Sequence, residues 1–154
     1  MRMTLHTDYA LRMLIYLAVH SDRTSTVNDI AESYGISRNH LLKVTLNLRR
    51  LGLVSTARGR SGGVRLALAP TEINVGTVVR AMGDGFPVVA CMADGEGCVL
   101  TPECKLRNVV RAAVGAYLSV FDSYSLADLV HNGDVLRTIL DLSAVSNAQG
   151  TVAA

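Results

Sequence analysis

The chain has 154 residues, of which 49% are hydrophobic and 18% are charged, and its formal net charge is +2 at pH 7. This composition excludes a disordered chain and is typical of one folded domain, or of a domain with a small annex. The small net charge favours no class of partner by itself, so the distribution of charge along the chain must indicate what the protein binds.

The first predicted helix covers residues 7–21, TDYALRMLIYLAVHS. Leu11, Leu14 and Ala18 recur at helical spacing, and apolar residues on the other sides predict a helix that is covered on more than one face. The run LRMLIYLAV is too short to cross a bilayer, and Arg12 interrupts it. We therefore expect no contact with a membrane and a cytoplasmic protein, in which lasting disulfides are not expected.

Two further helices are predicted, with a short turn between them. Residues 26–35 end at Gly35, and residues 36–52 begin with Ser37 as an N-cap. Two helices joined in this way are typical of a helix-turn-helix. The inward face of the second helix is expected to consist of Leu41, Val44, Thr45, Leu48 and Leu51.

A glycine-rich hairpin is predicted next. Residues 53–57 and 64–69 alternate as strands do, and the segment RGRSGG, residues 58–63, joins them as a turn. A hairpin directly after a helix-turn-helix is the plan of a winged helix-turn-helix. The expected fold class is therefore mainly α with a small β-hairpin wing.

The second half of the chain is predicted to be helical on both sides of one loop. Residues 74–83 form a helix, residues 101–124 form the longest helix with Pro102 in its first turn, and residues 125–132 form a last helix before a polar, mobile tail at 146–154. The apolar positions of the longest helix step by 4, 3, 4, 3 and 4 residues, which is typical of a coiled-coil seam. They are Leu106, Val110, Ala113, Tyr117, Val120 and Tyr124.

Basic residues are concentrated in the segment of the second helix and the hairpin. No acidic residue lies between Glu32 and Glu72, whereas seven of the fifteen basic residues do. Charge of one sign on a helix and a hairpin tip is what a surface that follows DNA phosphates needs, and Arg and Asn can read guanine and adenine in the major groove. A solvated basic face without a ligand is the alternative. The residues expected to contact DNA are Arg38, Asn39, His40 and Lys43 on the helix, and Arg58 and Arg60 on the hairpin tip.

All three cysteines, Cys91, Cys98 and Cys104, lie in the segment CMADGEGCVLTPEC. Buried core thiols are not favoured here, because the segment also contains acidic residues and glycines. Zinc sites and redox dithiols usually have closer cysteines than the gaps of six and five residues found here. A bulkier iron–sulfur cluster fits better, because a glycine-containing loop can wrap it and Cys104 would lie in the first turn of a helix, where the dipole favours a thiolate.

Three thiolates leave one position of such a cluster unassigned, since four ligands are usual. The fourth ligand is either an exogenous small molecule or a side chain other than cysteine, and spacing alone does not choose between them. The candidates by chemistry are Asp8, His6, His40, Asp94, Glu96 and Glu103.

Four segments, in order along the chain, resemble one known family: TDYALRMLIYLA, LVSTARGRSGGVRLA, FPVVACMADGEGCVLTPECKL and YSLADLV. They are similar to NsrR, the nitric-oxide-sensing branch of the Rrf-type winged-helix repressors. The sister branch, IscR, governs iron–sulfur assembly and carries a ligand histidine three residues after its last cysteine. Here that position is Arg107, which cannot ligate iron because it stays protonated.

The resemblance implies a homodimer joined through the long helix, in which Asp8 reaches across the dimer to the partner's cluster. It implies an iron–sulfur cluster, 4Fe-4S being favoured over 2Fe-2S, and a repressor that releases a palindromic operator in double-stranded DNA when nitric oxide attacks the cluster. The expected organisation is a DNA-binding domain at 1–72, a connecting helix and cluster loop at 73–100, a dimerisation helix at 101–125, and terminal helices with a mobile tail at 126–154.

Two other functions stay open at this point. One is a regulator of iron–sulfur assembly or redox stress in the same family, and the other is a small iron–sulfur electron carrier that does not bind DNA. An enzyme is not expected, because no Ser/His/acid or Cys/His arrangement is discernible and the four histidines are scattered.

Overall fold

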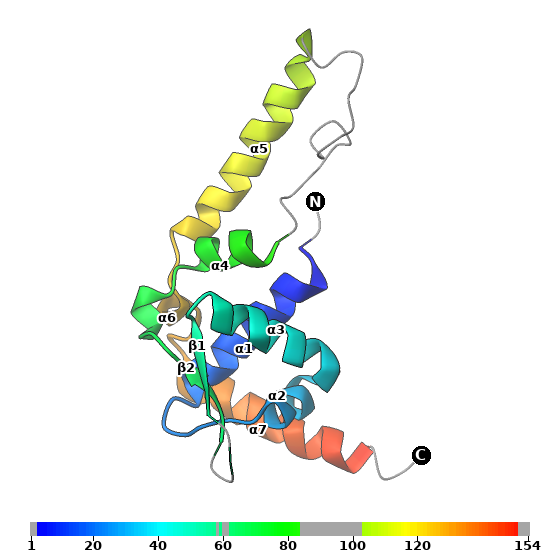
Figure 1. The fold of residues 1–154 in the computed structure, drawn as a ribbon, viewed down its shortest axis with the longest axis vertical. Coiled ribbons are helices and arrows are strands. Elements are labelled where there is room, and N and C mark those ends of the chain that lie inside the picture. The colour runs from blue at the N-terminus through cyan, green and yellow to red at the C-terminus, as the bar shows by residue number, and fades with distance from the viewer. Residues whose placement is uncertain (1–2, 58, 60–61, 84–102, 151–154) are drawn as a thin grey trace.

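The computed structural model describes residues 3–57, 59, 62–83 and 103–150. These residues form helices and one two-stranded antiparallel sheet (Figure 1), so the expected fold class is confirmed. The elements in chain order are α1 (Leu5–Val19), α2 (Val27–Tyr34), α3 (Arg38–Arg50), β1 (Val54–Ala57), β2 (Gly63–Leu66), a 3-10 turn (Pro70–Glu72), α4 (Val75–Met82), α5 (Lys105–Asp122), α6 (Leu126–Leu129) and α7 (Gly133–Gly150).

Helix α1 is the central helix of the fold. Ala10, Met13 and Leu14 are fully buried, and α3, α4, α6 and α7 all pack against it, as its apolar sides predict. The helix begins at Leu5 because Thr4 caps it: the backbone N–H of Thr7 donates to Thr4 Oγ1 over 3.1 Å. No helix in the described ranges combines the length and the apolar character that a membrane span needs.

Helices α2 and α3 form the predicted helix-turn-helix. Thr26 and Asp29 cap α2 reciprocally, through N–H···O bonds of 3.1 and 2.7 Å, and Gly35 ends it with φ of 62°. The prediction that Leu51 faces inward is wrong, because α3 ends at Arg50 and Leu51, 45% exposed, already lies in the following turn. The buried stripe of α3 is otherwise as predicted: Leu41, Val44, Thr45 and Leu48.

The hairpin is fastened to the segment between α1 and α2. Its register pairs Val54 with Leu66, so β2 ends three residues before the predicted end at residue 69. Ser25 exchanges two backbone hydrogen bonds with Val64, of 3.1 and 2.7 Å. A Cβ atom at Gly63 would lie 2.6 Å from the Ser25 carbonyl oxygen, so this close approach requires glycine.

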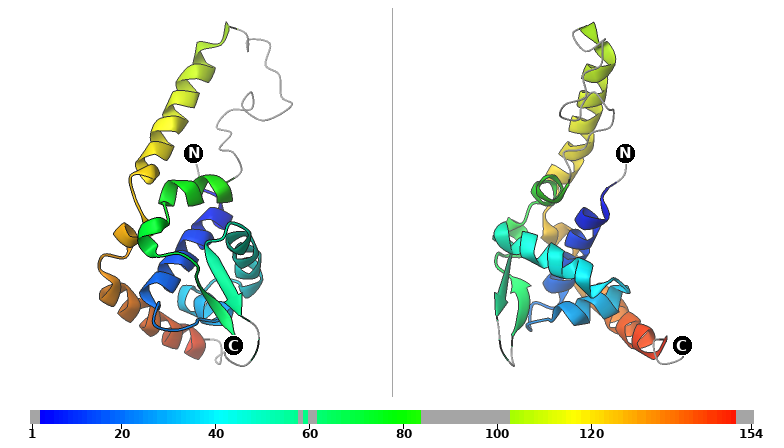
Figure 2. Two further views of the ribbon diagram at one scale, coloured as in Figure 1. Left: turned by 60° about the vertical axis from the view of Figure 1, so that its left-hand side comes forward. Right: turned by 45° about the vertical axis from the view of Figure 1, so that its right-hand side comes forward.

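Helix α5 projects from the rest of the chain and is anchored at its C-terminal end (Figures 1 and 2). Both Nη atoms of Arg80 on α4 donate to the Asp122 carboxylate, Nη2 over 2.7 Å, and Asn74 Nδ2 donates to the Asp122 carbonyl over 2.8 Å. The helix begins at Lys105 and not at residue 101 as predicted, because the backbone of Cys104 is extended, with φ of −78° and ψ of 102°. Cys104 is the N-cap residue.

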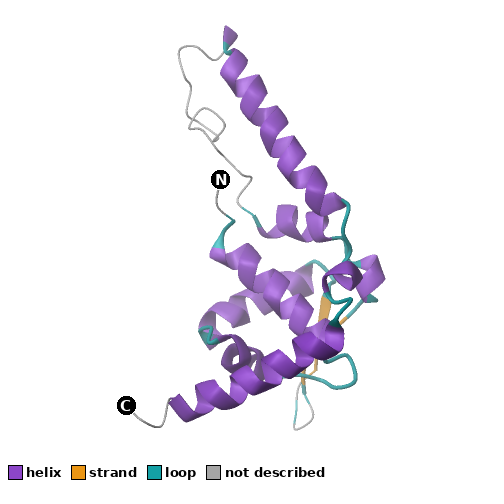
Figure 3. Ribbon diagram, turned by 180° about the vertical axis from the view of Figure 1, so that it is seen from behind, coloured by secondary structure: helices purple, strands orange, loops and turns teal. Residues whose placement is uncertain are grey.

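The predicted mobile tail at 146–154 is wrong for its first five residues, which belong to α7. This helix lies across the bottom of the fold (Figure 3) and is held by contacts that are distant in sequence. Arg137 Nη2 donates to Asp22 Oδ2 over 2.9 Å, and Asn147 Nδ2 donates to the Glu32 carbonyl over 2.7 Å. The buried ring of His20, at the end of α1, lies with Nε2 3.1 Å from Asp141 Oδ1.

Candidate nucleic-acid interface and cluster site

The start of α3 presents the residues that the sequence assigns to DNA. Arg38, Asn39 and His40 occupy the first turn and are exposed, and the exposed Lys43 follows one turn later. No acidic residue lies on α3, so its solvent-facing side carries positive charge only. The other two predicted DNA contacts, Arg58 and Arg60, lie outside the described residues.

Two leucines on the same helix are exposed and were not predicted as site residues. Leu42 is 41% exposed and Leu46 is 47% exposed, and neither belongs to the buried stripe. Apolar side chains in the major groove can contact the methyl group of thymine. The sequence does carry a signal for these two leucines. They lie outside the inward stripe of the helix, where the other outward residues are polar.

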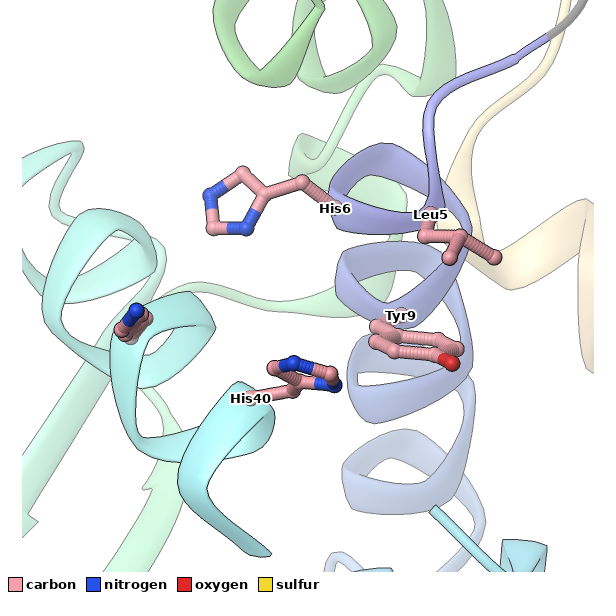
Figure 4. Close-up of a pocket in the computed structure, with 5 residues that line it drawn as sticks. Leu5, His6, Tyr9 and His40 are labelled. Atoms are coloured by element: carbon pink, nitrogen blue, oxygen red, sulfur yellow. The ribbon is translucent and has the colours of Figure 1, made fainter. Parts of the chain in front are cut away.

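A cavity of about 210 Å³ lies between the start of α1 and α3 (Figure 4). It is lined by Leu5, His6 and Tyr9 from α1 and by His40 and Lys43 from α3. The rings of Tyr9 and His40 are stacked, with centroids 6.1 Å apart. The structure therefore brings the start of α1 next to the first turn of α3, the helix predicted to contact DNA, which the sequence alone did not indicate.

A hydrogen bond also joins α1 to α3. Asn47 Nδ2, two turns along α3, donates to His6 Nε2 over 2.9 Å. His6 and His40, both candidates for the fourth cluster ligand, are thus engaged in contacts between the two helices.

Cys104 is the one cysteine among the described residues, and its thiol is free and half-buried. As the N-cap residue of α5 it makes no capping hydrogen bond with its side chain. The unpaired N–H groups at a helix N-terminus can donate to the sulfur atoms of a bound group, so Cys104 fits the role of a cluster ligand. Cys91 and Cys98 lie outside the described residues, as do Asp94 and Glu96.

Asp8 lies in the first turn of α1, with its carboxylate partly exposed. In every view of the ribbon the start of α1 lies well apart from the start of α5 (Figures 1–3), so one chain does not bring Asp8 to its own Cys104. Within the described part of the chain, no three His, Cys, Asp or Glu side chains meet as the ligands of one metal ion would. A cluster that uses both residues therefore needs two chains.

Two further residues flank Cys104. Glu103 precedes it and is exposed, which leaves it a candidate ligand. Arg107 lies in the first turn of α5, and its Nε atom is buried without a hydrogen-bond partner among the described residues.

Comparison with known proteins identifies the family. The family model described as "Rrf2: Iron-dependent Transcriptional regulator" matches residues 3–132. The chain is 46% identical over 144 residues to the "HTH-type transcriptional regulator NsrR" of Halalkalibacterium halodurans, covering 92% of this chain and 99% of that protein. The NsrR of Bacillus subtilis (strain 168) matches with the same identity, length and coverage. The resemblance to NsrR that the sequence motifs indicate is thereby confirmed.

Solved structures show the same fold. "T. potens IscR" superimposes with a TM-score of 0.68 and 26% identity, covering 86% of this chain and 88% of that one. CymR, described as the global cysteine regulator of B. subtilis, gives a TM-score of 0.65 and 28% identity, covering 86% and 98%. These relatives favour a regulator over an electron carrier. The chain belongs to the Rrf2 family of iron-dependent, winged-helix transcriptional regulators.

Proposed function

We propose that this transcriptional regulator is a repressor whose iron–sulfur cluster controls its affinity for a palindromic operator, and that nitric oxide acts on the cluster. One observation carries the proposal. A chain 46% identical to regulators named NsrR holds a free thiol, Cys104, at the N-terminus of a projecting helix.

DNA binding falls to α3 and the hairpin. The first turn of α3 enters the major groove, where Arg38 and Asn39 are suited to bidentate contacts with guanine and adenine. Lys43 contributes charge to the phosphate backbone or a base, and Leu42 offers an apolar contact to thymine. Arg58 and Arg60 hold the neighbouring backbone or minor groove.

The cluster is held by Cys91, Cys98 and Cys104 of one chain and by Asp8 of the partner subunit, with 4Fe-4S favoured over 2Fe-2S. When bound, the cluster supplies iron that reacts with nitric oxide, and a carboxylate is a weaker, harder ligand to that iron than a thiolate. The protein's own residues link the cluster to two helices. Cys104 connects it to the N-terminus of α5, and Asp8 connects it to the N-terminus of α1.

Dimerisation falls to α5. None of its residues is buried in one chain, and Leu106 and Val109 are 61% and 63% exposed. Apolar side chains of this size on a projecting helix are expected to pack against a partner. A two-fold dimer would present two copies of α3 about one turn of DNA apart, which matches a palindromic operator.

The test is operator affinity before and after nitric oxide. An operator is first selected from random duplex DNA with anaerobically purified dimer, and its affinity is measured by fluorescence anisotropy. We expect affinity to fall roughly 5- to 150-fold on treatment, the usual range for coupling between two sites. Cys104→Ser should remain dimeric but lose tight binding, whereas Ser119→Ala on the same helix should behave as wild type. Affinity that is the same with and without the cluster would contradict the proposal.

A further inference from the structure

Helices α1 and α3 meet at two levels that differ in packing. At the deeper level they share the hydrophobic core, where Thr45 Oγ1 lies 3.5 Å from Met13 Sδ and Leu41 is fully buried. At the outer level they border the cavity of about 210 Å³ (Figure 4). The hydrogen bond from Asn47 to His6 and the stack of Tyr9 on His40 cross between them there.

This difference in packing determines which part of α1 can move. Close-packed side chains cannot shift without overlap, so the deeper level acts as a fixed pivot. The start of α1 lines the cavity through Leu5, His6 and Tyr9, so a small tilt of α1 there changes the cavity before it disturbs the core. Such a tilt reaches α3 through the two contacts that bridge the helices.

The positions of the contact residues connect the two functional regions. On α1, His6 and Tyr9 stand on either side of Asp8, the proposed cluster ligand. On α3, His40 lies in the first turn, between the proposed DNA-reading residues Asn39 and Lys43.

We infer that the His6–Asn47 hydrogen bond and the Tyr9–His40 ring stack transmit the state of the cluster to the DNA-reading helix. All four are positioning residues, and none of them contacts iron. His6 and Tyr9 also make no contact with DNA. When Asp8 is held, α1 holds the first turn of α3 in the orientation that fits the operator. When Asp8 is released, both contacts let α3 turn. This inference rests on the proposed function, since it needs a cluster that reports through Asp8.

The test compares operator affinity of cluster-loaded and cluster-free dimers in four variants. Asn47→Ala and His6→Ala remove the hydrogen bond, and Tyr9→Leu independently removes the ring stack. In each variant we expect an unchanged cluster spectrum. The ratio of the operator affinity of the cluster-loaded dimer to that of the cluster-free dimer should fall from the wild-type value towards one. His6→Gln keeps a hydrogen-bond acceptor and should keep the ratio.

Lys43→Ala is the matched control, because Lys43 lines the same cavity without bridging the helices. It should weaken binding of both forms equally and leave the ratio unchanged. Hydrogen–deuterium exchange supplies a readout that does not depend on DNA: the amides of residues 38–43 should differ between loaded and free wild type, and not in Asn47→Ala.

The outcomes separate the inference from the function it rests on. A wild type whose affinity depends on the cluster, together with bridging variants that keep the full ratio, would overturn the inference alone. If the operator affinity of the wild type is the same with and without the cluster, the proposed function is overturned, and the inference with it.

Discussion

Asp8 and Arg12 form an ion pair one turn apart on α1, with Arg12 Nε 2.9 Å from Asp8 Oδ2. The guanidinium of Arg12 also lies over the ring of Tyr34 on α2, 5.8 Å from its centroid. Burial raises the pKa of Tyr34 to about 12, so its ring stays neutral and accepts the cation on its face. The proposed cluster ligand is thus connected to the first helix of the DNA-binding motif as well as to α3.

The first prediction concerns Asp8 itself. Asp8→Ala leaves the three thiolates in place, so the protein should still bind iron, but its absorption spectrum and its rate of reaction with nitric oxide should change. Asp134→Ala, which removes an exposed carboxylate from the first turn of α7, is the control. If Asp8→Ala matches wild type in both the spectrum and the reaction with nitric oxide, Asp8 is neither a ligand nor a residue that tunes the cluster.

The second prediction separates base reading from phosphate contact on α3. Asn39→Ala should cost about 1–3 kcal/mol of operator affinity and relax the base preference at one position of each half-site. If Lys43 contacts a phosphate, Lys43→Ala should weaken binding to all duplexes alike and reduce the slope of log affinity against log salt by about one. Anisotropy titrations over a salt series measure both quantities. Equal losses on operator and random DNA for Asn39→Ala would exclude base reading by Asn39.

The third prediction concerns the exposed face of α5. Leu106→Glu places a charge at an exposed position of the predicted seam and should weaken the dimer by on the order of 2 kcal/mol, or about 30-fold in its dissociation constant. Asn108→Glu adds the same charge on the opposite side of the helix and should leave the dimer intact. Sedimentation velocity distinguishes the two. A dimer that survives Leu106→Glu unchanged would place the interface elsewhere.

The fourth prediction concerns acid stability of the cluster-free protein. Hydrogen bonds from Arg80 lower the pKa of Asp122 below its usual value, so the folded state holds its proton less tightly than the unfolded state does. The stability that Asp122 contributes is present above its unfolded pKa of about 3.9 and is lost as the pH falls through the lower folded value. Asp122→Asn should therefore lose less stability than wild type between about pH 5 and pH 3, measured by urea unfolding. Parallel pH profiles for the two proteins would contradict this.

Much of the DNA-binding half could be predicted from the sequence, because its signals are local. The caps at Thr26 and Gly35 and the inward stripe of α3 depend on residues within a few positions of one another. Helix α7 was missed because its stability comes from partners over 100 residues away, such as Asp22 for Arg137 and Glu32 for Asn147.

The α1–α3 contact could not be predicted for the same reason. His6 and Asn47 are 41 positions apart, and nothing in either local pattern indicates that they meet. Part of the proposed cluster site could also be predicted, because the cysteine spacing and the position of Cys104 beside a helix start are local features. A ligand from another chain could not be predicted, because it does not affect the spacing.

We propose that iron and sulfide held by this chain control how it binds DNA. The most direct test of this proposal is metal and acid-labile sulfide analysis of protein purified without oxygen, with an absorption spectrum recorded as nitric oxide is added. We expect brown protein with iron and sulfide in equal amounts, whose spectrum bleaches within a few equivalents of nitric oxide. A colourless protein that contains zinc, or neither iron nor sulfide, would contradict it.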